Sequence, residues 1–317
     1  MKKPIFILAP MDDVTDTVFR RIVASCAAPD LFFTEFVNVD GLQSRGRPKL
    51  LPKIAKAGEK HPVVAQIWGK IPENFEKTAG ELVEMGFAGV DINFGCPVKT
   101  VTKNSCCSAM IMSENREPAV EIIKAVQRGV DGRVPVSVKT RLGFKEIDLS
   151  WIELLLEQKL NMLSIHARTA KEMSKADPHW EVFEEIIAMR DRISPETLIV
   201  GNGDILTRAD GLRLAKELKL DGIMIGRGIF HNPYLFAGDK SPWVGMSKKQ
   251  KLELFMSHVE LFAKTWSKGE RRFETLKKFV KIYVNGFEDA GELRDSIMHC
   301  ETIKELVGLL RVSIDKC

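Results

Sequence analysis

Eight short apolar segments, rich in β-branched residues, recur along residues 4–228 and alternate with stretches of helical periodicity. In stretches such as 117–130 and 150–160, apolar residues stand three and four positions apart, which indicates amphipathic helices. This alternation is typical of a (β/α)8 TIM barrel, an α/β fold of about 250 residues. An open doubly wound sheet, which also alternates strand and helix, is the alternative. The predicted strands are 4–11, 31–37, 62–69, 89–95, 135–143, 162–168, 197–204 and 222–228.

Beyond residue 238 the pattern changes to helix following helix. The predicted helices there cover 248–268, 270–288, 290–300 and 303–314. We therefore expect two domains, a TIM barrel over residues 1–238 and a small all-α C-terminal domain over residues 239–317. A helical unit of this size is small for an independent fold, so we expect it to pack on the barrel.

Composition excludes several classes of protein. The chain has 317 residues, of which 44% are apolar and 28% charged, as in an ordinary globular protein. No run approaches the roughly 18 apolar residues of a membrane-spanning helix, and the N-terminus resembles a first strand rather than a signal peptide. The six cysteines include no CxxC and no pair at zinc spacing. We expect a cytoplasmic protein without metal or membrane association.

The ends of the predicted strands carry polar and special residues. The active site of a TIM barrel lies at the C-terminal ends of its strands, so these residues are site candidates. They are Pro10, Met11, Asp12, Glu35, Gln66, Asn93, Cys96, Lys139, Arg141, His166, Arg168, Asn202, Gly203, Asp204, Gly226 and Arg227.

The loops after strands seven and eight read VGNGDI and IGRGIFHNP. Such glycine-containing loops in these two units often bind phosphate, although tight turns closing the barrel are the simpler interpretation of the glycines alone. Lys139 and Arg141 add cations to the same end, and Gln66 and His166 offer hydrogen bonds to a polar ring. From these residues alone, we expect a ligand with a phosphate and a polar ring.

A set of motifs resembles the flavin-dependent tRNA-dihydrouridine synthases. They are APMDDVTD from Ala9, TEF from Thr34, AQIWG from Ala65, DINFGCPVKTV from Asp91, VKTRLG from Val138, IHART from Ile165, VGNGDI from Val200, IGRGIFHNP from Ile225 and the helical segment from Arg271. The resemblance implies an oxidoreductase that uses FMN and NADPH to reduce the C5=C6 bond of a uridine in tRNA. The cofactor would carry the hydride chemistry while the protein orients it.

The resemblance also assigns roles to residues. Those implied around FMN are Pro10, Met11, Gln66, Lys139, His166, Asn202, Gly203, Asp204, Gly226 and Arg227. Those implied for the substrate are Glu35 and Asn93 at the uracil edge, with Arg141, Arg168, Lys277 and Lys278. Cys96 matches the catalytic position of the family.

Proton donation suits Cys96 chemically. Hydride addition at C6 leaves negative charge over C5 and O4, and C5 then needs a proton. A thiol with an ordinary pKa of about 8.5 is protonated near neutrality and can supply it. We therefore expect Cys96 to act as a general acid; a packed small side chain is the alternative.

Two segments depart from the family pattern. SCCSA places Cys106 and Cys107 where many members have glycine or alanine. We interpret them as small residues filling a tight turn, with a redox or metal role, or proton donation by one of them, as the alternative. The segment TAKEMSKADPHW from Thr169 lacks the tyrosine and glycine of many members, so its contact with the nucleotide is expected to differ.

A basic stretch of the helical region is expected to bind the phosphates of tRNA, with an ordinary solvated helix face as the alternative. It contains Lys264, Lys268, Arg271, Arg272, Lys277, Lys278 and Lys281. A one-to-one complex with tRNA requires no dimer, so a monomer is expected. Three rival functions remain open: an FMN barrel acting on a small molecule, a tRNA-binding protein without catalysis, and a phosphate-binding isomerase without flavin.

Overall fold

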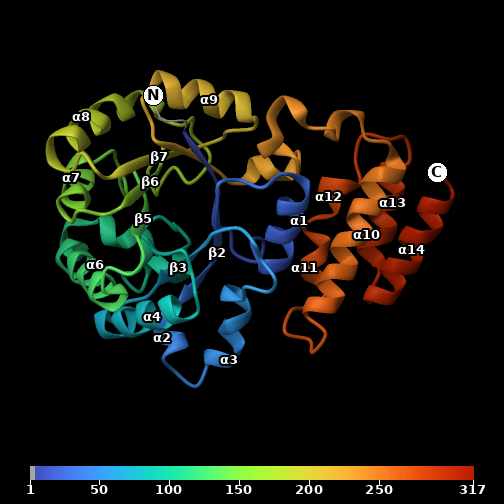
Figure 1. The fold of residues 1–317 in the computed structure, drawn as a ribbon, viewed down its shortest axis with the longest axis horizontal. Helices are drawn as coiled ribbons and strands as arrows, with labels where there is room; N and C mark the ends of the chain where they lie inside the picture. Colours follow the sequence, from blue (N-terminus) through green and yellow to red (C-terminus); the bar gives the residue numbers. More distant parts are fainter. Residues whose placement is uncertain (1–3) are drawn as a thin grey trace.

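The computed structural model describes residues 4–317, and its core is a closed barrel of eight parallel strands in the order β1 to β8 (Figure 1). Each strand pairs with the next along the chain, and β8 pairs with β1. Closure confirms the predicted TIM barrel and excludes the open doubly wound sheet. The strands are β1 (Ile5–Leu8), β2 (Leu31–Asn38), β3 (Val63–Trp68), β4 (Gly89–Asn93), β5 (Val136–Arg141), β6 (Met162–His166), β7 (Leu198–Asn202) and β8 (Gly222–Ile225).

Alternation along the strands divides the barrel into an inner and an outer set of side chains. The inner apolar set fills the interior as one cluster, containing Ile7, Ala9, Phe33, Val64, Met162, Val200 and Met224. Intervening residues such as Phe6 and Leu8 belong to a second, larger core under the helices. The interior is therefore packed rather than open, and ligands must bind above this layer.

Helices cover the outside of the barrel. They are α1 (Thr17–Ala27), α2 (Val39–Leu42), α3 (Arg47–Leu50), α4 (Pro72–Glu84), α5 (Lys99–Thr102), α6 (Arg116–Val130), α7 (Leu149–Glu157), α8 (Phe183–Ile193) and α9 (Arg208–Glu217). Of these, α6 and α7 match the predicted segments 117–130 and 150–160. Gly129 allows α6 to lie close on α4, because a Cβ there would stand 2.2 Å from the carbonyl oxygen of Glu76.

The C-terminal helices lie to one side of the barrel, next to α1 (Figure 1). They are α10 (Lys248–Thr265), α11 (Glu274–Lys277), α12 (Val280–Tyr283), α13 (Ala290–His299) and α14 (Ile303–Asp315). The prediction of one helix over 270–288 is wrong, because the segment forms only two single turns. Buried residues on both turns, such as Leu276, Phe279 and Tyr283, still keep the spacing of a helix face and pack toward α1 and α10.

One hydrophobic core runs from beneath the barrel helices into the C-terminal helices. Phe19 of α1 packs on Phe279 with ring centroids 4.8 Å apart, and Phe255 of α10 stacks on Tyr283. The helical region thus packs on the barrel, as expected, and the boundary near residue 238 stays a prediction. Within residues 4–317, no helix combines the length and apolar character that crossing a bilayer requires.

Candidate active site

The strand register brings the predicted polar residues together at the C-terminal mouth of the barrel. Asn93 pairs with Lys139 across β4 and β5. One level higher, Arg141 pairs with His166, which pairs with Asn202. Since these positions alternate with outward-facing residues, their side chains share the interior above the apolar layer.

A buried hydrogen-bond network forms the floor of the mouth. Gln66 donates to Asp91 at 2.7 Å, Ser137 donates to the other carboxylate oxygen at 2.5 Å, and Asn93 donates to the amide oxygen of Gln66 at 2.9 Å. Burial raises the pKa of Asp91 to about 6 against these hydrogen bonds. Sequence reasoning missed Asp91, although a charged residue inside a buried strand was a usable signal.

The turn that carries Cys96 is held from two sides. Asn93 accepts hydrogen bonds through its side-chain oxygen from the backbone N–H groups of Gly95 and Cys96, both at 3.0 Å. Arg141 donates to the carbonyl oxygen of Gly95 at 2.7 Å. Burial raises the pKa of the Cys96 thiol, so the thiol stays protonated over a wider pH range than a free cysteine.

Cys96 lines a cavity of about 200 Å³ that opens beside the mouth. Sequence reasoning named Cys96 and Asp12 in its wall but missed the aromatic and basic members. The lining residues are Asp12, Phe36, Asn38, Leu50, Lys53, Trp68, Cys96, Val98, Thr100 and Val101. The cavity is large enough for a small planar group next to the thiol.

Lys139 and His166 contribute a cation and a neutral ring to the mouth. Burial and then the nearby Arg141 lower the pKa of Lys139 to about 8. Burial and the surrounding cations also lower the pKa of His166, so its imidazole is neutral and accepts from Arg168 at 3.3 Å. Within residues 4–317, the buried hydroxyl of Ser164 has no hydrogen-bond partner.

The loops after β7 and β8 place backbone donors at the opposite side of the mouth. No acceptor within the described part of the chain faces the N–H groups of Gly203, Asp204 or Gly226. The Asp204 carboxylate pairs with Arg168 and, at 2.7 Å, with Arg227, and the pairing with Arg168 lowers its pKa. The positive charge of the two guanidinium groups therefore exceeds the negative charge of the single carboxylate. The loops thus fit an anion such as phosphate.

Several predicted substrate residues are engaged in contacts within the protein. Arg141 is buried and also donates to the carbonyl oxygens of Thr169 and Met173, and Arg168 donates to that of Ala176. These contacts tie the Cys96 turn to the loop after β6, which is the segment with the unusual sequence from Thr169.

Glu35, which we expected at the uracil edge, is fully buried and paired with Arg271. Its carboxylate is occupied in this arrangement and does not face the mouth freely. Lys277 donates to the carbonyl oxygen of Met298 at 2.8 Å, whereas Lys278 pairs with Asp13 at 3.1 Å. Lys278 thus lies near the barrel mouth and Lys277 within the helical region.

Cys106, Cys107 and Val101 form one buried apolar cluster, and the half-buried Cys96 and Trp68 pack against it. In residues 4–317, the three carboxylates of Asp12, Asp13 and Glu35 are the one group with ligand atoms close enough to share a metal ion. Burial raises the pKa of Cys107 well above its ordinary value. These observations favour the interpretation of Cys106 and Cys107 as packed side chains.

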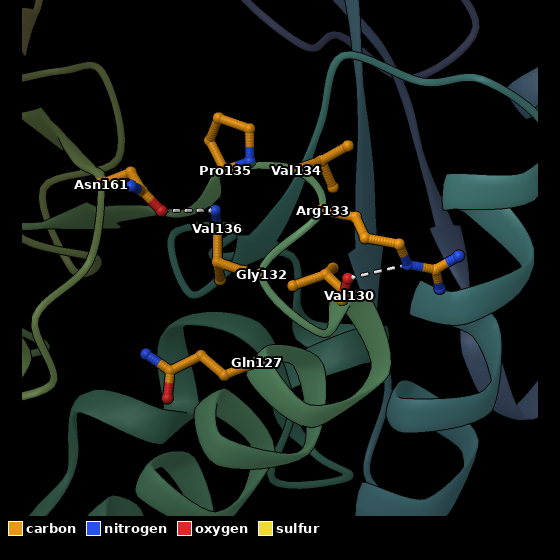
Figure 2. A pocket seen from close by; sticks show the side chains of 8 residues that line it. All are labelled: Gln127, Val130, Gly132, Arg133, Val134, Pro135, Val136 and Asn161. Carbon is orange, nitrogen blue, oxygen red and sulfur yellow. Dashed lines mark hydrogen bonds between the residues drawn. The ribbon is translucent and has the colours of Figure 1, made fainter.

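A larger hollow of about 350 Å³ lies at the opposite end of the barrel (Figure 2). Val136, the first residue of β5, donates there to the side-chain oxygen of Asn161 at 2.8 Å. Arg133 donates to the carbonyl oxygen of Val130 at 3.3 Å. Such structural contacts lie in the wall of the hollow, and none of the predicted site residues lines it.

Comparison with known protein families shows which family the chain belongs to. The sequence model of the dihydrouridine synthase (Dus) family matches residues 7–316. The chain belongs to the dihydrouridine synthase family. It is 46% identical over 313 residues to a probable tRNA-dihydrouridine synthase of Staphylococcus aureus strain N315, covering 98% of this chain and 93% of the relative. It is 43% identical over 315 residues to probable tRNA-dihydrouridine synthase 2 of Bacillus subtilis strain 168, covering 98% and 94%.

Dihydrouridine synthases are flavin-dependent oxidoreductases, which confirms the class of enzyme that the motifs implied. Solved structures agree on the fold. A 2-naphthoyl-CoA reductase has a TM-score of 0.56 at 13% identity, covering 77% of this chain and 50% of that protein. A histamine dehydrogenase from Rhizobium sp. 4-9 has a TM-score of 0.53 at 11% identity, covering 98% and 62%. At such identities the likeness supports the barrel alone.

Proposed function

We propose that this dihydrouridine synthase reduces the C5=C6 bond of specific uridines in tRNA to 5,6-dihydrouridine, with FMN as its flavin and NADPH as the reductant. The observation that carries the proposal is the Cys96 thiol, held protonated at the mouth by burial. The family match over residues 7–316 includes the helical region, which a barrel acting on a small molecule does not need.

The mouth fits FMN on its own chemistry. The buried Ser164 hydroxyl lacks a partner within residues 4–317 and can hydrogen-bond a polar ring, and the Lys139 ammonium adds a cation at the same mouth. The free N–H groups of Gly203 and Gly226, with Arg227, suit its phosphate. Bound FMN supplies hydride transfer to C6 of the uracil. The other residues that we assign around it are Pro10, Met11, Gln66, His166, Asn202 and Asp204.

The protein's own contribution is to hold the uridine and to deliver a proton. The target base must leave its stack to reach a barrel mouth. Asn93 and Arg141 fix the backbone around Cys96, so the thiol has a defined position. Cys96 then gives its proton to C5, where negative charge develops, while the neighbouring cations of Lys139 and Arg141 stabilise that charge.

We propose that Arg141, Arg168 and Lys278 contact the substrate and that Asn93 lies at the uracil edge, as the family resemblance implies. Glu35 is fully buried and paired with Arg271, and Lys277 donates to the carbonyl oxygen of Met298, so we assign both of them structural contacts first. Since tRNA is the proposed substrate, we infer that the enzyme acts in the cytoplasm, as a monomer on one tRNA.

The test is to purify the protein, record its flavin absorbance, and incubate it with NADPH and an unmodified tRNA transcript. We expect NADPH-dependent bleaching of the flavin and dihydrouridine at one or a few mapped positions. Oxidation of NADPH on free pyrimidines with unchanged tRNA would show a small-molecule enzyme instead. A colourless protein that binds phosphate would support the isomerase.

A further inference from the structure

Five charged side chains join the helical region to the barrel across one small area. Arg271, just before α11, pairs with the buried carboxylate of Glu35 and lies 3.4 Å from Asp13. Lys278 reaches the same Asp13 at 3.1 Å. Lys53 lies 3.6 Å from Glu35 and 3.7 Å from Asp13. Three cations therefore compensate these carboxylates, which argues against a metal ion there.

Arg271 is fixed by more than its ion pairs. Its guanidinium donates to the carbonyl oxygen of Pro52 at 3.3 Å and lies over the Trp266 ring, 5.7 Å from the ring centre. Trp266 in turn donates its indole N–H to Asp16 at 3.0 Å, and Asp16 also caps the N-terminus of α1. Only 8% of the Arg271 side chain is exposed, so water screens its interactions little.

The barrel side of this contact is also the wall of the Cys96 cavity. Asp12 and Lys53 line the cavity and pair with each other, and Lys53 reaches the Arg271 partners Glu35 and Asp13. Asp13 donates its backbone N–H to Glu35 at 2.7 Å, which ties the loop after β1 to β2. One connected network thus links the helical region to side chains beside the reactive thiol.

We propose that the Glu35–Arg271 pair is a positioning pair, which fixes the helical region relative to the Cys96 cavity and thereby selects the tRNA uridine that is reduced. The inference rests on the proposed function. The uridine that reaches the thiol, in an RNA held by the helical region, then depends on how the Glu35–Arg271 pair fixes that region on the barrel. Misplacement of a reacting group by about 1 Å can cost on the order of 100-fold in rate.

The neutral variants Glu35→Gln and Arg271→Gln and their double mutant test the proposal. Each single change leaves its partner charge buried, so some loss of stability is expected. Arg190→Gln is the matched control. Arg190 is also buried and pairs with Asp221 at 2.7 Å, between α8 and the residue before β8, away from the mouth. All rates are taken per bound flavin, below the unfolding temperature of each variant.

For both single variants we expect kcat on tRNA to fall about 10- to 100-fold, with dihydrouridine spread to additional positions and with flavin reduction by NADPH unchanged. The double variant should be no worse than either single one, since both remove the same contact. Arg190→Gln should lose stability while keeping kcat and position. An unchanged kcat and product map in both single variants, or an equal fall in flavin reduction, would overturn the positioning role.

Amide hydrogen exchange separates this inference from the proposed function. In Glu35→Gln and Arg271→Gln, exchange should quicken in residues 11–16 and 266–278, and it should not do so in Arg190→Gln. If NADPH reduces the flavin of the wild type but no uridine in tRNA is reduced, the proposed function fails. The exchange rates of the variants then still test whether the Glu35–Arg271 pair anchors the helical region. Unchanged exchange in both segments contradicts an anchoring pair.

Discussion

The side-chain oxygen of Asn93 accepts hydrogen bonds from both Gly95 and Cys96, and so fixes the turn that carries the thiol. Replacing Asn93 by alanine frees this turn and removes a donor to Gln66. We expect the single-turnover rate of uridine reduction to fall about 10- to 100-fold, while flavin reduction by NADPH is unchanged. Asn104→Ala, in the exposed loop nearby, is the control. An equal fall of the single-turnover rate in Asn104→Ala would contradict the specific role of Asn93.

The charge of Lys139 gives a pH dependence to flavin binding. Its pKa is lowered to about 8, so the ammonium is present below that pH and disappears as the pH rises through it. Apo-protein should therefore bind FMN roughly tenfold more weakly at pH 9 than at pH 7, as measured by fluorescence titration. Lys139→Met should bind weakly at both values, whereas Lys124→Met, on the outer wall, should follow the wild type. A flat wild-type response contradicts this assignment.

Local sequence patterns predicted the barrel because each strand and helix has its own periodicity. All eight strands formed, although most are shorter than predicted, since their last residues leave the ladder to form the mouth loops. Conversely, the 270–288 segment carries the apolar spacing of one helix but forms only the two single turns α11 and α12. The family resemblance, rather than the pattern, supplied FMN and tRNA.

Contacts at the site between segments far apart in the sequence could not be predicted from the sequence. Glu35 was expected at the substrate, but its partner Arg271 lies 236 positions away and carries no local signal. Lys53 and Trp68 line the Cys96 cavity only because the segment after β2 and the end of β3 converge there. Periodicity identifies the face of an element, and it does not identify which buried charges meet across a domain contact.

A buried histidine in the helical region predicts acid sensitivity. Burial lowers the pKa of His258 to about 3, and its ring contacts Phe279 and the Tyr283 hydroxyl. The unfolded chain binds a proton below about pH 6.5 and the folded one does not, so stability falls as the pH drops below that value. The contribution is about 1.4 kcal/mol per pH unit between roughly pH 6 and pH 4.

His258→Gln should show a correspondingly shallower pH dependence of the unfolding free energy, measured by urea denaturation at pH 7, 6 and 5. The exposed His299 offers the matched control, His299→Gln, which should retain the wild-type slope. Parallel slopes for His258→Gln and wild type would contradict a neutral buried imidazole.

Exposed cations of the helical region should make tRNA binding sensitive to salt. Lys264, Lys268 and Lys281 are exposed, whereas Arg271 is engaged with Glu35. In the triple glutamine variant of these lysines, a plot of log affinity against log salt should become shallower by roughly 0.7–0.9 for each RNA phosphate that is no longer neutralised. Filter binding over about 50–200 mM salt measures this. An unchanged slope places the RNA on another face.

The role of Cys96 is tested most directly by single-turnover reduction of an unmodified tRNA transcript, with the flavin reduced beforehand by NADPH. Wild type, Cys96→Ala, Cys106→Ala and the exposed Cys317→Ala are compared at pH 7. We predict that only Cys96→Ala loses on the order of 10²–10⁴-fold in the rate of dihydrouridine formation. A wild-type rate in Cys96→Ala would show that the proton comes from another group, and a loss confined to Cys106→Ala would identify that thiol as the donor.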